Sequence, residues 1–319
     1  VIARDFILQN GCHVTDGAML SRCYVGQASA IGHGFSATDS YFACNSQAEH
    51  GEHAPYWLGP YTVTHHKSTL LIGGMFSFMN AGSGTNQSNH AYKLGPRHHG
   101  VLERGCKTVS GCHISWPAHI GAFSLVMGHC PPGTDSHEWP FSYLVEQGNA
   151  YYVLPGITLR GVGTLRDIGK WPARDRRSPR VPQTDTVSFD AFFPLISMER
   201  GMAGQHTLEG LNGRFGEDAK EITWNGLRLK EKSVKQGIEW YRLALDRYLG
   251  EQLIRQLETH EGMPSDGLCE LLRPRATCSD RWGDIGGMLA PISEINDIIR
   301  TITTGQLDRI EKLGERFRH

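Results

Sequence analysis

Apolar positions recur every six residues along three parts of the first half of the chain. Within this pattern, the hexads "VGQASA" and "IGHGFS" (25–36) place a glycine after the aliphatic residue and small residues near the fifth position. A period of six matches neither the repeat of about 3.6 residues in a helix nor the repeat of about two in a strand. It is typical of a parallel β-helix, in which each hexad forms one short strand and a corner. The repeated positions are Leu8, Val14 and Leu20, then Val25, Ile31 and Ala37 after a slip of one residue, then Ile72, Phe78 and Gly84, and finally Leu102, Thr108, Ile114, Ile120 and Val126.

The pattern predicts a mainly β protein with a parallel β-helix domain over residues 1–165. Three hexads make one coil, so the aliphatic side chains point inward and residues about 18 apart lie above one another. The alternative is a glycine-rich α/β protein with chance spacing, which requires amphipathic segments of about ten to fifteen residues between its strands. Residues 1–165 contain no such segments, so we favour the β-helix.

Three stretches break the period, at 45–66, 85–101 and 129–152. Insertions leave a solenoid at its corners and commonly line its binding surface. Of the 16 histidines, 14 precede residue 207, and they concentrate in these breaks. We therefore expect the chemistry in the breaks and not in the regular hexads, His33 included.

The character of the chain changes after residue 165. Residues 166–186 are rich in proline and arginine without an apolar period, which predicts an extended linker. Its arginines at 174, 176, 177 and 180 would grip a phosphate or form a solvated surface. Residues 187–319 are predicted to be mainly α-helical, because 217–260 and a segment from about Ser293 towards Phe317 carry apolar residues at helical spacing. Their apolar faces are expected to form core or oligomer contacts.

Composition narrows the function classes. The formal net charge of −1 gives no overall field for nucleic acid or an anionic membrane. No apolar run is long enough to span a bilayer, and the first residues lack the features of a signal peptide, so we expect a cytoplasmic protein. Because the chain opens on Val1, inside a repeat, we expect a fragment or processed product. The eight cysteines form no C-x-x-C pair, which disfavours a zinc ribbon and favours buried free thiols.

The histidine-bearing breaks supply the candidates for catalysis. A histidine with proton affinity near neutrality can take the proton of a hydroxyl or amine that attacks an acyl carbon. Neighbouring asparagines would hold the oxyanion that develops in this step. The candidate general bases are His65, His66 and His90, with Asn86 and Asn89 as orienting groups and Lys67, Arg97, His98 and His99 as further substrate-binding residues. Phosphate-loop, nucleophile-elbow and dinucleotide-binding motifs are missing from the sequence.

A metal site is the alternative use of the same histidines. His50, His53 and His65, with water as a fourth ligand, would make a catalytic zinc site. The two histidines of "EHGEH" (49–53) lie on a loop and do not have the helical spacing of H-E-x-x-H. His65 and His66 would point to opposite faces of a strand, so at most one would serve a given site. His119 and His137 lie 18 apart and would stack if no insertion intervenes.

The hexads at 8–42, 72–84 and 102–126 resemble those of the left-handed β-helix (hexapeptide-repeat) acyltransferases. The layout, chiefly residues 65–90 and 163–177, is similar to a bacterial family labelled as UDP-N-acetylglucosamine acyltransferases. The resemblance implies a left-handed coil and a trimer with active sites between adjacent β-helices. It also implies a histidine base, no tightly bound cofactor, and an acyl-CoA or acyl-carrier-protein donor that acylates a sugar nucleotide.

The interrupted coils and the long C-terminal region depart from those enzymes. Two other functions therefore stay open. The same fold supports a zinc-dependent hydratase resembling the gamma-class carbonic anhydrases, whose zinc ligands come from neighbouring subunits. It also supports a non-catalytic scaffold or sugar-nucleotide-binding protein, because a fold does not determine a function.

Overall fold

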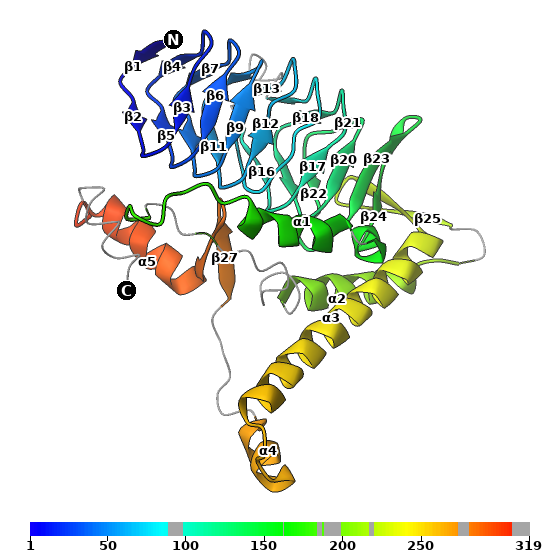
Figure 1. The fold of residues 1–319 in the computed structure, drawn as a ribbon. Helices are drawn as coiled ribbons and strands as arrows, with labels where there is room; N and C mark the ends of the chain where they lie inside the picture. The colour runs from blue at the N-terminus through cyan, green and yellow to red at the C-terminus, as the bar shows by residue number, and fades with distance from the viewer. Residues whose placement is uncertain are drawn as a thin grey trace.

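Short parallel strands stack into the three walls of a β-solenoid of about eight turns in the computed structural model (Figure 1). The structure describes residues 1–88, 98–161, 163–183, 187, 199–216, 220–273 and 281–307. Wall A contains β1 (Ile2–Arg4), β4 (Met19–Ser21), β7 (Ser36–Thr38), β10 (Glu52–His53), β13 (Leu70–Leu71), β15 (Asn86–Ser88), β18 (His113–Ser115) and β21 (His129–Cys130). Wall B contains β2 (Ile7–Leu8), β5 (Tyr24–Val25), β8 (Tyr41–Phe42), β11 (Tyr56–Leu58), β14 (Gly74–Phe76), β16 (Gly100–Leu102), β19 (Ala118–Ile120) and β22 (Thr134–Asp135).

Wall C consists of two sheets that single bridges at Asn80 connect. The first sheet contains β3 (His13–Val14), β6 (Ala30–Gly32), β9 (Gln47–Glu49) and β12 (Val63–Thr64). The second contains β17 (Lys107–Thr108), β20 (Leu125–Met127), β23 (Tyr143–Gln147), β24 (Ala150–Leu154), β26 (Leu227–Lys230) and β25 (Glu221–Trp224).

The strand register defines the length of a turn. On wall A, Ile2 pairs with Met19, Met19 with Ser36, Ser36 with Glu52 and Glu52 with Leu70, which are steps of 17, 17, 16 and 18 residues. In wall A, the residue after each of these paired positions points into the coil and has at most 4% of its surface exposed. These inward residues are Leu20, Ala37, His53, Leu71, Gln87, Ile114 and Cys130. The predicted interior is therefore confirmed as a column of stacked side chains, although most of these turns are shorter than three full hexads.

Most predicted inward positions are correct in two of the three runs, although Leu8 in the first turn is 43% exposed. Val25 and Ile31 are buried in the early turns, and Leu102, Ile114, Ile120 and Val126 are fully buried in the later ones. The frame at 72, 78 and 84 is wrong by one residue, because Leu71 and Met79 occupy the interior instead. Phe78 lies at a corner with φ of 51° and contacts Trp171 outside the coil. Turns of 16 and 18 residues shift the frame, and a strict period of six cannot follow such a shift.

The corners require an unusual backbone conformation. Asn45, Tyr61, Phe78 and Phe123 all have φ between 51° and 58°, a region that side chains with a Cβ rarely adopt. These residues lie at equivalent corners of the coil, with Gly105 at the same corner between Phe78 and Phe123, so the fold repeats the same backbone conformation. Gly26 meets a different constraint, because a Cβ there would lie 2.7 Å from the backbone carbon of Ala43 in the next turn. This supports the expected steric role of the glycine in "VGQASA".

The predicted extended linker at 166–186 is wrong in its first part. The short helix η2 (Ile157–Arg160) leads into α1 (Gly163–Ala173), and an extended segment follows. Trp171 of α1 packs against Phe78 in a tilted arrangement and stacks on Phe123, with ring centroids 4.4 and 6.1 Å away, which holds the helix against the corners of the solenoid. The segment after α1 then runs back along the solenoid (Figure 1), where Gln27 donates a hydrogen bond to the carbonyl of Pro182. We call residues 163–183 the strap.

The C-terminal region contains strands as well as the predicted helices. Its helices are α2 (Gly201–Asn212), α3 (Glu231–Thr259), α4 (Ser265–Leu271) and α5 (Ile292–Thr303), and β27 (Trp282–Ile285) and β28 (Met288–Pro291) form a hairpin. Tyr152 of β24 pairs with Arg228 of β26, so the region extends wall C and is not a separate helical domain. Arg104 and Asp284 form a buried ion pair of 2.7 Å that attaches the hairpin to the solenoid.

No helix in the described part of the chain is both long enough and apolar enough to cross a membrane. The expected buried thiols are present in the solenoid, where Cys23, Cys106, Cys112 and Cys130 are free and buried and Cys44 is also buried.

Candidate functional site

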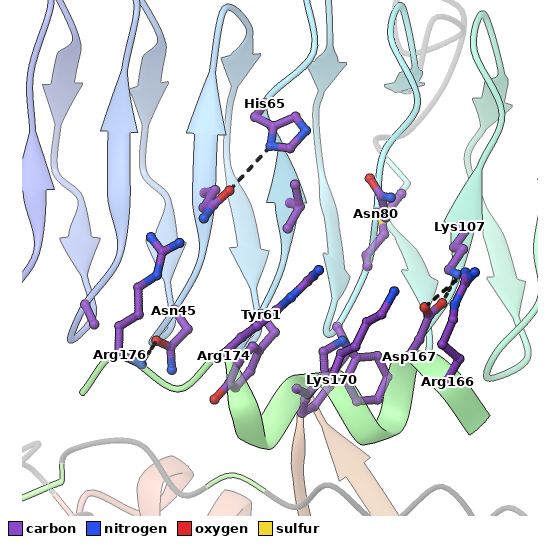
Figure 2. A pocket seen from close by; sticks show the side chains of 16 residues that line it. Asn45, Tyr61, His65, Asn80, Lys107, Arg166, Asp167, Lys170, Arg174 and Arg176 are labelled. Atoms are coloured by element: carbon purple, nitrogen blue, oxygen red, sulfur yellow. Dashed lines mark hydrogen bonds and ion pairs between the residues drawn. The ribbon is translucent and has the colours of Figure 1, made fainter. Parts of the chain in front are cut away.

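A cleft of about 550 Å³ between wall C and the strap is lined by several charged side chains (Figure 2). One column of register partners forms its floor. Gln47 pairs with Val63, Val63 bridges to Asn80, and Asn80 bridges to Lys107. These four side chains therefore come from successive turns and lie on a rigid wall, which is the kind of support that a preorganised site needs.

The strap supplies the other side of the cleft with cations. Arg166, Lys170 and Arg174 follow one another at intervals of four residues, so they lie on one face of α1 and its end. Figure 2 shows Lys170 and Arg174 rising from this helix towards the wall. Arg176 in the extended part of the strap also lines the cleft. Its backbone N–H donates to the side-chain oxygen of Asn45, which fixes this part of the strap on the solenoid.

The electrostatic balance of the cleft is strongly positive. Its lining contains five lysine and arginine side chains and one carboxylate, that of Asp167. Asp167 pairs with Lys107 and with Arg166. Within the described residues, Lys170, Arg174 and Arg176 have no carboxylate at ion-pair distance. The cleft thus presents unneutralised donors that suit a phosphate or another polyanion.

His65 is the histidine that lines this cleft. It follows β12, and its Nδ1 lies 3.4 Å from Oε1 of Gln47, an acceptor that favours a proton on Nδ1. Nε2 then carries the lone pair. Burial, and next the neighbouring His66, lower the pKa of His65 below its usual 6.5. The imidazole is therefore neutral at pH 7, which is the form that a general base requires.

The structure separates most of the other predicted site residues from His65. His66 is exposed and lines a neighbouring depression, and Lys67 lies on an exposed turn. Asn86 is on wall A, where its side-chain oxygen accepts a hydrogen bond from Ser88. The structure therefore keeps His66 beside His65, with ring centroids 4.4 Å apart, and places Asn86 on another wall, because a turn of the coil sends neighbouring segments to different walls.

The remaining predicted residues also lie elsewhere. His98 and His99 precede β16 on wall B, and His99 lines a separate shallow cavity. His90, Asn89 and Arg97 lie outside the described residues. The cleft residues that the sequence analysis missed are Asn80 and Lys107 on the wall and Arg166 and Lys170 on α1. The spacing of 166, 170 and 174 around Trp171 was the available signal for this helix.

The alternative zinc set of His50, His53 and His65 does not fit a metal. His53 points into the solenoid interior with no exposed surface, and burial lowers its pKa to about 3. His50 is on an outer corner and stacks on His33, with ring centroids 4.9 Å apart. The three side chains thus occupy the interior, an outer corner and the cleft, so this set is rejected.

These features define a parallel β-solenoid protein with a cationic cleft that a helical strap closes on one side. Residues 1–212 match the model of the family described as a domain of unknown function, DUF4954, and the chain belongs to this family. The matched range includes every residue that lines the cleft. A search of curated proteins found no match.

Proposed function

We propose that the cleft binds a phosphorylated sugar nucleotide and that the protein transfers an acyl group to it from acyl-CoA or acyl carrier protein. The observation that carries the proposal is the position of a neutral histidine, His65, opposite a cationic face formed by Lys170, Arg174 and Arg176. The resemblance of the hexads to left-handed hexapeptide-repeat acyltransferases supports the choice of acyl transfer. The proposal takes the coil to be left-handed, as in those enzymes.

The cations would bind the diphosphate of the acceptor. Guanidinium groups form paired hydrogen bonds with phosphate oxygens, and a lysine adds a mobile point charge. The cleft volume of about 550 Å³ lies within the usual range of small-molecule sites.

His65 would act as the general base. Its Nε2 takes the proton of the acceptor hydroxyl or amine while that oxygen or nitrogen forms a bond with the thioester carbon. The carbonyl oxygen becomes an oxyanion, for which the side-chain amide of Asn80 on the cleft floor is the donor in reach of the same space. The C–S bond then breaks, and the thiolate takes the proton back from His65. Asn80 replaces the predicted Asn86 in this role.

The test is acyl transfer from acetyl-CoA and from acyl carrier protein to a panel of nucleotide sugars. We expect H65Q to lose activity by at least a hundredfold, which is the usual contribution of a general base. H13Q is the control, because His13 is an exposed histidine of the same wall. Full activity of H65Q would overturn the assignment of the base.

Binding is tested separately from turnover. Isothermal titration with UDP-N-acetylglucosamine should show that the charge reversals K170E and R174E weaken binding. R255E, an exposed arginine on α3, should leave binding unchanged. If K170E and R174E weaken binding but no donor supports acyl transfer, the function is sugar-nucleotide binding without catalysis. Equal binding by all the variants would exclude the cleft as the site.

A further inference from the structure

A second group of side chains with metal-ligating chemistry lies on wall B, outside the cleft. His119 of β19 and Asp135 of β22 are direct register partners on adjacent parallel strands. His137 follows Asp135 by two residues, and its ring stacks on that of His119 with centroids 5.0 Å apart. The stacking predicted from the spacing of 18 residues is therefore confirmed, and a carboxylate joins the two imidazoles.

The geometry of this group is close to that of a metal site. One ligand atom from each of His119, Asp135 and His137 lies within 4.8 Å of the other two. Nδ1 of His137 is 2.6 Å from Oδ1 of Asp135. Tetrahedral ligands at about 2.0–2.1 Å from a zinc ion are roughly 3.3 Å apart, so small side-chain rotations would close the group around an ion.

Partners around the group orient it. Nε2 of His119 contacts Oε1 of Glu103 at 2.8 Å, and Glu103 also pairs with Arg200 at the start of α2. The Glu103 side chain is 7% exposed, so a buried carboxylate fixes the orientation of the His119 ring. A carboxylate bound to one imidazole nitrogen is the usual second partner of a metal-binding histidine, and it leaves Nδ1 for the ion. The side chains of the three ligands are 38–41% exposed, which lets an ion enter.

We propose that His119, Asp135 and His137 bind a divalent transition-metal ion, with Zn²⁺ as the best fit and water in the fourth position. Two imidazoles and one carboxylate suit zinc, whereas magnesium and calcium prefer oxygen ligands throughout. Binding exchanges the hydrogen bond between His137 and Asp135 for bonds to the metal. Any proton that the ligand nitrogens carry is released to solvent.

The ion would join two neighbouring strands in the last turns of the solenoid. His119 lies in β19 and Asp135 in β22, and Glu103 connects His119 to Arg200 before α2. An ion that binds the folded chain raises its melting temperature. This site is independent of acyl transfer, since its residues do not line the cleft.

The test uses tag-free protein stripped with EDTA and titrated with ZnCl₂ in a calorimeter, with MgCl₂ as the ion control. We expect one Zn²⁺ per chain, a higher melting temperature with zinc, and no response to magnesium. D135N and H137Q should bind zinc at least tenfold more weakly. H129Q is the control, because His129 is an exposed histidine that also pairs with a carboxylate, Glu146, at 3.1 Å.

Two further measurements make the result decisive. The melting temperatures of the EDTA-treated variants should stay close to that of the native chain, which separates loss of ligands from loss of fold. Co²⁺ should give visible absorption bands of a tetrahedral site in the native protein and in H129Q but not in D135N. Absence of stoichiometric zinc, or undiminished binding by both D135N and H137Q, would overturn the proposal.

Discussion

Replacing His53 with leucine should stabilise the protein and remove part of its acid sensitivity. His53 has no exposed surface, and neither ring nitrogen has a hydrogen-bond partner among the described residues. Its ring instead lies edge-on to Phe35 at 4.6 Å. Because an unpartnered buried polar group costs about 1–3 kcal/mol, H53L should be more stable than the native chain by a similar amount at pH 7.

The pH dependence follows from the pKa of this group. Burial lowers the pKa of His53 from 6.5 to about 3 in the folded chain, whereas the unfolded chain keeps the ordinary value. The unfolded state therefore binds a proton between these two values that the folded state does not bind. Stability falls as the pH falls below 6.5, by about 1.4 kcal/mol per pH unit. The loss from this group reaches about 2.5 kcal/mol by pH 4.5 and is absent from H53L.

Urea unfolding followed by circular dichroism at pH 7.0, 6.0, 5.0 and 4.5 measures both effects. The difference in unfolding free energy between H53L and the native chain should widen as the pH falls. H13L is the control, because His13 is exposed on wall C and should not change the slope. A constant difference across this pH range would refute the argument that His53 stays neutral in the interior.

Three other outcomes test the structure. D284A should lower the free energy of unfolding in urea by about 3 kcal/mol, because it leaves the guanidinium of Arg104 buried without its carboxylate. D39A, in the exposed pair with Arg22, is the control and should leave the urea midpoint nearly unchanged. W171A should release the strap from the solenoid, because it removes the contact with Phe78. Trypsin should then cleave faster after α1, and UDP-N-acetylglucosamine should bind more weakly. Unchanged cleavage would contradict the role of Trp171 in holding the strap. If His65 is the base, acyl transfer should rise with pH to a plateau with a midpoint below pH 6.5, because the pKa of His65 is lowered. A midpoint above 6.5 would contradict the assignment.

Much of the solenoid could be predicted from local sequence, because each turn repeats the same inward aliphatic positions. Val25, Ile31 and Ile120 are inside, as the hexads predict. The frame failed around Leu71, where turns of 16 and 18 residues adjoin. His53 shows a further limit, because its place in a break of the pattern makes it a candidate zinc ligand, while its register with Ala37 and Leu71 places it in the core.

The candidate site was predictable only in part. His65 was among the predicted bases, but its partners were not, because they come from other turns of wall C and from the strap about a hundred residues later in the chain. Residues 166–174 were predicted to be extended, since the proline and arginine content hid the helical spacing. Pro172 lies inside α1 near its end.

The sequence by itself determined that the chain coils, which side chains fill the coil in its regular runs, and that histidines are abundant on it. These properties depend on local sequence, because each turn contains its own copy of the repeated inward positions. Only the tertiary structure decided which histidines share a site. A side chain's wall depends on the accumulated lengths of the preceding turns, and the strap lies beside wall C because Trp171 and Asn45 hold it there. The cationic cleft and the His119, Asp135 and His137 group are products of that long-range register.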